Sequence, residues 1–250
     1  MRRAQTQATS GRPYQENLLA TLAKLLPLVD PASHPFLAGN DSKNMAVVLL
    51  STDKGLVGAL NTNLMRTVSQ MGKGQAIYYT VGRKGRKFVV KTGLRLKADF
   101  ENVDTVTPRA AKQLAKLLID SFATSEIGEA DLIYPHFIST LKQEPKQVKL
   151  LPIDLQSIGD ESSEEFLFDE APDVLLDDLL VHHLEEQIYQ ALLETKAAEH
   201  SARMVTMKNA TDNALDLVED LTLAYNQTRQ NAITTELLEI TTAQAAMQLL

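Results

Sequence analysis

The C-terminal part of the chain contains the stretch SARMVTMKNATDNALDLVEDLTLAYNQTRQNAITTELLEI (Ser201–Ile240). It lies within a longer segment, Asp173–Leu250, in which 78 residues pass without a glycine or a proline. Because these two residues are the strongest helix breakers, the segment predicts one continuous helix of roughly 117 Å, at about 1.5 Å per residue. Ordinary helices are far shorter, so this helix dominates the predicted architecture.

Small and apolar residues recur along this helix at alternating spacings of three and four. The repeat extends over about six heptads and is typical of a supercoiled pair of helices. Its positions are Met207, Ala210, Ala214, Leu217, Leu221, Ala224, Thr228, Asn231, Thr235, Leu238, Thr242, Ala245 and Leu249. Many of these residues are small or polar, so we expect close backbone approach with a modest hydrophobic contribution.

The N-terminal segment 1–26 predicts a second helix, which Pro27 ends. Its leucines at positions 18, 19, 22, 25 and 26 recur at helical spacing, and Gly11 and Pro13 are expected to kink or break it. This helix reaches roughly 39 Å at most and can cover only a third of the C-terminal helix. We therefore interpret the protein as a shaft with another polypeptide around it.

Between the two helices, residues 27–158 alternate between short apolar runs and helical patterns. The expected strands are Met45–Leu50, Ala76–Val81, Leu94–Phe100, Ala130–Ser139 and an antiparallel Gln147–Asp154. The expected helices are 61–71, 83–91 and 108–125, the last with Leu114, Leu117 and Leu118 on one face. This alternation predicts a Rossmann-like α/β domain. An acidic linker, 159–173, then leads to the long helix 174–250.

The composition narrows the classes of function. The chain has 250 residues, a net charge of -7 and no cysteine. The acidic balance disfavours a nucleic-acid binder, and the lack of cysteine excludes disulfides and thiolate chemistry. The N-terminus has no apolar signal core, and no window is long and apolar enough to span a membrane. A role at a membrane would therefore need partners.

Three clusters could carry chemistry, and each has a simpler interpretation. Ser51–Asn61 follows the first strand, where doubly wound folds often bind phosphates, but Gly55 and Gly58 lack the dinucleotide spacing, so we favour a structural turn. His182, His183 and Glu186 offer too few ligands for a metal site and are interpreted as a solvated helix face.

The third cluster is basic. It comprises Arg83, Lys84, Arg86, Lys87, Lys91, Arg95 and Lys97. It could meet an acidic partner or phospholipid headgroups, although such runs are most often solvated surface. The acidic residues of the chain lie in runs that we interpret as exposed, and no catalytic triad or carboxylate pair stands out. We therefore expect no catalytic residue, no cofactor and no metal.

Three segments carry a resemblance to a known family. Gln187–Ile240 closely resembles the signature of gamma subunits of F-type ATP synthases, and its part from Ser201 onward is highly specific. Ser51–Leu64 (STDKGLVGALNTNL) is similar to the family's second signature, and Arg2–Leu18 resembles the late part of its N-terminal helix. Together these segments indicate a likeness over nearly the whole chain.

The resemblance implies a fold and a set of partners. The N- and C-terminal helices would form a long antiparallel coiled coil inside a ring of alpha and beta subunits. The α/β domain would contact the epsilon subunit and the membrane c ring. The chain would transmit torque without catalysing a reaction, as a peripheral protein at the cytoplasmic face of a bacterial inner membrane. The family normally has several more helical turns before the residues matching Met1, so either the true start lies upstream of Met1 or the N-terminal helix is naturally shortened.

The resemblance further implies roles for particular residues. Arg229 and Gln230 match the family's Arg-Gln element that touches the beta-subunit loops, and Thr234 follows one turn later. Gln187 and Tyr189 would lie near the foot of the shaft. Two other interpretations of the sequence stay open. One is a nucleotide-binding α/β enzyme with a helical oligomerisation arm, and the other is a self-associating coiled-coil scaffold.

Overall fold

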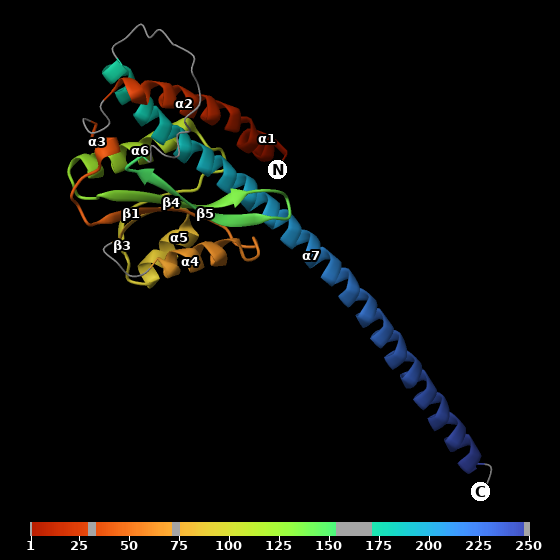
Figure 1. Ribbon diagram of the computed structural model, residues 1–250. Coiled ribbons are helices and arrows are strands. Elements are labelled where there is room, and N and C mark those ends of the chain that lie inside the picture. The colour runs from red at the N-terminus through yellow and green to blue at the C-terminus, as the bar shows by residue number, and fades with distance from the viewer. Residues whose placement is uncertain (1, 30–33, 72–75, 154–171, 248–250) are drawn as a thin grey trace. The chain divides into compact units, whose positions relative to one another are not determined.

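A five-stranded sheet organises the first part of the protein (Figure 1). The computed structural model describes residues 2–29, 34–71, 76–153 and 172–247. Its strands are β1 (Met45–Leu50), β2 (Ala76–Val81), β3 (Arg95–Phe100), β4 (Glu129–Phe137) and β5 (Gln143–Leu151). Their order is β3-β2-β1-β4-β5, with β5 antiparallel to β4 and the other neighbours parallel. The prediction of an α/β fold with a final antiparallel strand is confirmed.

Burial explains which runs form the inner strands. Five of the six residues of β1 and of β2 are buried, which is typical of parallel strands covered on both faces. β3 lies at the edge and alternates between exposed and half-buried residues, as its sequence predicts. β5 begins at Gln143 rather than Gln147, because polar residues pair with β4 through their backbone at the other edge of the sheet.

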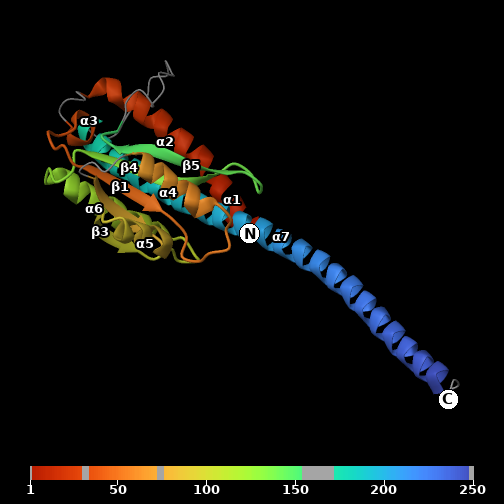
Figure 2. The ribbon, with the colours of Figure 1, turned by 90° about the horizontal axis from the view of Figure 1, so that it is seen from below.

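Helices cover both faces of the sheet. They are α1 (Arg2–Ser10), α2 (Arg12–Leu25), α3 (Pro35–Ala38), α4 (Leu60–Gln70), α5 (Arg83–Lys91), α6 (Pro108–Ala123) and α7 (Pro172–Met247), with a 3-10 turn at Leu26–Leu28. α4 and α5 cover one face, and α2, α6 and the first part of α7 cover the other (Figures 1 and 2). In α6, Leu114 and Leu118 are buried as expected, but Leu117 is exposed.

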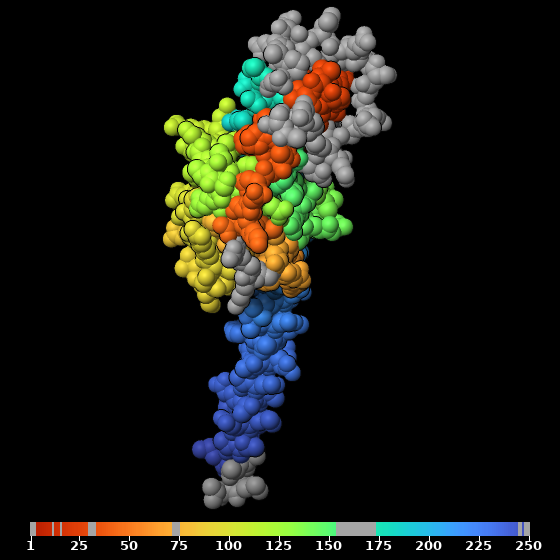
Figure 3. Space-filling view, turned by 60° about the vertical axis from the view of Figure 1, so that its left-hand side comes forward, coloured from red at the N-terminus to blue at the C-terminus, as the bar shows by residue number. Residues whose placement is uncertain are grey.

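The short segment that contains α3 covers one end of the sheet. The ring of Phe36 in α3 packs edge-on against Phe122 of α6, and the backbone N–H of Ile153 donates to the carbonyl of Phe36 at 2.8 Å. In the space-filling view this orange-red segment lies between α6 and β5 (Figure 3). The acidic stretch 159–173, which the sequence interprets as a linker, lies almost wholly outside the described residues.

The two terminal helices pair in antiparallel fashion, as expected. The side chain of Gln5 contacts Ser201, whereas the hydroxyl of Tyr14 contacts His182 at 2.7 Å, so the numbering runs in opposite directions along the pair. The N-terminal helix divides at Gly11 into α1 and α2, which confirms the expected break.

The chain divides into two units, Met1–Val205 and Thr206–Leu250. α7 contributes to both, because it is one helix that begins at Pro172, a favourable first-turn residue, and ends at Met247. Within the described ranges, no helix combines the length and the apolar character needed to cross a bilayer.

Candidate functional site

The site begins at the sheet edge where open α/β folds usually bind ligands. In such folds the ligand crevice lies beyond the carboxyl ends of the strands, where the strand order reverses. Here β2 and β4 flank β1, so this switch point lies between β1 and β4. Val57 and Leu60, which follow β1, and Phe137, the last residue of β4, pack against α7, so α7 lies at this edge of the sheet.

The turn after β1 is held by its own hydrogen bonds. The Ser51 hydroxyl donates to the carbonyl of Val81 at 2.9 Å and accepts the backbone N–H of Gly85 at 2.8 Å. Gly82 has a φ of 94°, and a Cβ on it would clash with the Ser51 carbonyl, so only glycine fits there. The structure thus places Ser51–Asn61 in a tightly bonded turn.

The second half of this turn packs on α7. Val57 and Leu60 form a buried cluster with Ala198 and Ala202 of the long helix. The two alanines have no side chain beyond Cβ, so the turn can approach the helix backbone closely. The segment that resembles the family's second signature is therefore a docking surface for α7.

Polar groups bind one side of α7 to the sheet. The Lys196 ammonium donates to the carbonyl of Asn102 at 3.0 Å and lies 3.3 Å from the Glu199 carboxylate. The Asn102 amide donates to that carboxylate at 3.3 Å and to the carbonyl of Ser51 at 2.8 Å. All four residues are buried, so a buried ion pair and a buried amide connect α7 to the ends of β1 and β3.

Other polar groups bind a different side of the same helix turns. The Glu194 carboxylate lies 2.5 Å from Nδ1 of His136, which is on β4. The Gln190 amide donates to the backbone carbonyl of Ala8 in α1 and also contacts Glu194 at 3.4 Å. The amide oxygen of Gln190 faces Gly11 and has no hydrogen-bond partner among the described residues.

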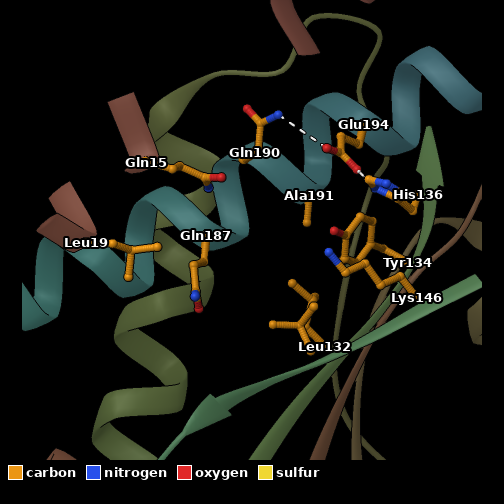
Figure 4. Close-up of a pocket in the computed structure, with 11 residues that line it drawn as sticks. Gln15, Leu19, Leu132, Tyr134, His136, Lys146, Gln187, Gln190, Ala191 and Glu194 are labelled. Carbon is orange, nitrogen blue, oxygen red and sulfur yellow. Dashed lines mark hydrogen bonds and ion pairs between the residues drawn. The ribbon is translucent and has the colours of Figure 1, made fainter. Parts of the chain in front are cut away.

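A cavity of about 270 Å³ opens beside these groups (Figure 4). Residues of α2, β4, β5 and α7 line it, including Gln187, which the resemblance places near the foot of the shaft. Figure 4 shows Glu194 linking Gln190 to His136 at one side of this cavity. Tyr189, the other residue that the resemblance places near the foot, is half-buried against the core.

The buried polar contacts of Glu194 and Glu199 are not predicted from the sequence. It predicts exposed acidic runs, and for Glu194 and Glu199 this prediction is wrong, since each side chain is buried. Their partners His136 and Asn102 are 58 and 97 residues away in the chain, so no local spacing marks the pairs. The nearest signal is the run of alanines that accompanies them on α7, because small residues allow close packing.

The solvated face expected at His182, His183 and Glu186 is also wrong in part. His183 is buried, and burial, followed by the nearby charge of His182, lowers its pKa from 6.5 to about 4. Glu186 is half-buried, and burial raises its pKa. Within the described residues no group of acidic or histidine side chains is arranged to hold a metal ion.

The basic cluster lies on α5 and β3. Arg86 forms an ion pair with Asp99 at 2.9 Å, and both Lys97 and Arg95 approach Glu126. The remaining members are exposed or half-buried on α5: Arg83, Lys84, Lys87 and Lys91. Part of the cluster is therefore neutralised within the protein.

The second unit presents the residues expected to touch a partner. Arg229, Gln230 and Thr234 are exposed, and Gln230 and Thr234 share a helix face because they are four residues apart. Large apolar side chains on the same helix are exposed as well. They are Leu215, Leu217, Val218, Leu221, Leu223, Tyr225, Ile233, Leu237, Leu238, Ile240 and Met247.

The exposed apolar side chains do not form a single face. At about 100° per residue, Leu217, Val218, Leu221 and Tyr225 fall within one arc of about 100°, but Leu215 and Leu223 lie outside it. Further on, Ile233, Leu237 and Ile240 fall within another arc of about 60°, and Leu238 points about 100° or more away from each of them. An apolar face on one side suits one neighbouring helix, whereas apolar residues all round suit a surrounding protein wall.

The fold and the site together define a class of protein in which a doubly wound sheet packs against a long helix beyond the carboxyl ends of its strands. The family model described as ATP synthase matches residues 1–247. The ATP synthase gamma chain of Methylacidiphilum infernorum is 38% identical, covering 99% of this chain and 89% of the relative. That of Symbiobacterium thermophilum is 37% identical, covering 99% and 88%.

A chain from the Euglena gracilis mitochondrial ATP synthase has the same fold. Its TM-score is 0.65 at 19% sequence identity, and the match covers 98% of this chain and 94% of that chain. The chain belongs to the ATP synthase gamma-chain family.

Proposed function

We propose that this chain is the central rotor shaft of an F-type ATP synthase. In this proposal it transmits torque between a proton-driven c ring and a catalytic head of alpha and beta subunits, and it catalyses no reaction itself. The observation that carries the proposal is the second unit, a helix whose large apolar side chains are exposed. Exposed apolar surface of this extent marks a contact with another protein.

The arrangement of those side chains supports a surrounding partner. A self-associating coiled coil needs a single apolar seam, whereas Leu223 and Leu238 lie outside the arcs that the other large apolar side chains occupy. A ring of alpha and beta subunits would enclose the helix on all sides. The names of the relatives and the solved neighbour agree with such an assembly.

The first unit would face the membrane end of the complex. We propose that the epsilon subunit and the c ring contact it near Gln187 and Tyr189, and that the protein reaches the membrane only through these partners. Its place would then be peripheral, at the cytoplasmic face of a bacterial inner membrane.

Arg229, Gln230 and Thr234 are the proposed contacts with the beta subunits. The guanidinium of Arg229 can bind a carboxylate with two parallel hydrogen bonds, and the amide of Gln230 can both donate and accept. All three side chains are exposed, so they are available to a partner.

The double substitution Arg229→Ala and Gln230→Ala tests this role. We expect proton pumping and ATP hydrolysis by the complex to fall, while the unfolding midpoint of the free chain stays unchanged, because both positions are exposed. Lys208→Ala with Asn209→Ala is a matched exposed control on the same helix. Unchanged hydrolysis and pumping in the first double variant would contradict the assigned contact.

A further inference from the structure

The section Gln190–Glu199 of α7 is enclosed by the rest of the first unit. Every residue in it is buried, including Gln190, Glu194, Lys196 and Glu199. Elsewhere in the described part of α7, buried residues alternate with exposed or half-buried ones, or are absent. A helix that is buried all round has packed surface on every side.

Apolar packing alone would hold such a helix weakly against rotation about its own axis. Several enclosed residues are alanines, and Ala191, Ala197 and Ala198 present a smooth surface to their neighbours. Hydrophobic attraction depends on the area removed from water and has no direction. Hydrogen bonds require particular distances and angles, so they resist rotation.

The polar contacts lie on opposite sides of the helix. At about 100° per residue, Gln190 and Glu194 point roughly opposite to Lys196 and Glu199. The first pair binds α1 and β4, through the carbonyl of Ala8 and the ring of His136. The second pair binds Asn102, which is itself bonded to the carbonyl of Ser51.

Rotation of α7 in its seat would therefore break contacts on both sides at once. The Lys196–Glu199 and Arg203–Glu199 ion pairs lie within α7 and would remain, but each broken contact would remove the bond of a buried polar side chain to Asn102, His136 or Ala8, which is unfavourable. We call these four side chains, Gln190, Glu194, Lys196 and Glu199, the polar lock.

We propose that the polar lock fixes α7 against rotation relative to the sheet, so that torque passes between the helix and the α/β domain without slipping. This inference rests on the proposed rotor function. The lock residues are positioning residues, because they hold the helix in register and touch no nucleotide. The turn Ser51–Asn61 packs against the same section of α7 through Val57 and Leu60.

Stability and coupling respond differently to changes in this lock. In Lys196→Met with Glu199→Leu, apolar side chains of similar volume replace the buried ion pair. Such replacements are often neutral or stabilising, but they remove the directional contacts on one side. Glu199→Gln keeps the directional contacts but loses the ion pair. Its amide oxygen can still accept hydrogen bonds from Asn102 and Lys196, whereas the negative charge is gone.

The experiment compares these variants in the whole complex, in inverted membrane vesicles. Proton pumping per ATP hydrolysed is measured together with thermal unfolding of the free chain. We expect the double variant to unfold no earlier than wild type yet to pump at less than about half the wild-type ratio, because the contacts that resist rotation are lost. We expect Glu199→Gln to unfold earlier yet to keep the wild-type ratio.

Val89→Ala is the control for loss of stability alone, because Val89 is buried on the other face of the sheet, in the cluster with Val47 and Leu64. It should lower the unfolding temperature and leave the pumping ratio unchanged. A wild-type ratio in the double variant would overturn the polar lock and leave the rotor function intact. A wild-type complex that hydrolyses ATP without pumping would overturn both proposals.

Discussion

Two sections of the same helix have opposite surroundings. In Gln190–Glu199 charged side chains are buried and bonded, whereas from Met207 onward apolar side chains such as Leu217 and Leu221 are exposed. Residue type alone would predict the reverse. The first section is therefore covered within this chain, whereas we propose that another protein covers the second in the complex.

The largest expected effect distinguishes the two sections directly. Ala197→Asp places a charge at a position that is 0% exposed, where water cannot reach it. We expect the free energy of unfolding of the free chain to fall by roughly 3–5 kcal/mol. The matched change Ala232→Asp lies at an exposed position, and we expect it to stay within about 0.5 kcal/mol. Urea unfolding followed by circular dichroism measures both free energies. Equal losses in the two variants would contradict the proposed difference between the two sections of the helix.

A smaller effect should appear on acidification, through His183 in the buried part of α7. Its pKa is about 4 in the folded chain, compared with 6.5 for a histidine in water, so the folded chain favours the neutral ring. The stabilisation is complete above pH 6.5 and is lost as the pH falls toward 4. We expect a loss of about 2 kcal/mol between pH 7.5 and pH 5.

The variant His183→Leu isolates this contribution, because Glu186, whose raised pKa acts in the opposite direction, remains in both proteins. Urea unfolding at both pH values should show a smaller loss in the variant than in wild type. The same loss in both proteins would show that His183 is not buried as a neutral ring. The described residues from Met207 onward contain no histidine, so we expect no such titration there.

The smallest effect on the free chain is expected from Leu217→Ser with Leu221→Ser. Both side chains are about 60% exposed, so the free energy of unfolding should change by less than about 0.5 kcal/mol. In the complex the same change should weaken retention of the alpha and beta subunits, since apolar contact area is lost. A pull-down at increasing urea concentration measures this, and unchanged retention would mean that no partner covers these residues.

Much of the fold follows from the sequence. The apolar, β-branched runs at Met45–Leu50 and Ala76–Val81 predict buried strands with their observed bounds. The 78 residues without glycine or proline predict the long helix, and Gly11 predicts the break between α1 and α2. These features are local, so a single segment carries the whole signal.

The enclosed section could not be predicted in the same way. Glu194 and Lys196 look like ordinary surface residues of a helix, because the groups that bury and pair with them come from β4 and from the end of β3. His183 is also buried, and its place in the sequence beside the exposed-looking His182 does not mark it as a core residue. Contacts between distant segments depend on the whole fold, which no local pattern encodes.

We propose that this chain is the single shaft of a rotary ATP synthase. The most direct test is a native mass spectrum of the complex that a C-terminally tagged copy pulls from its own membranes. We expect alpha and beta subunits together with one copy of the chain. If the tagged chain is recovered alone, or as an oligomer of itself, this result would contradict the proposal and would favour a self-associating scaffold.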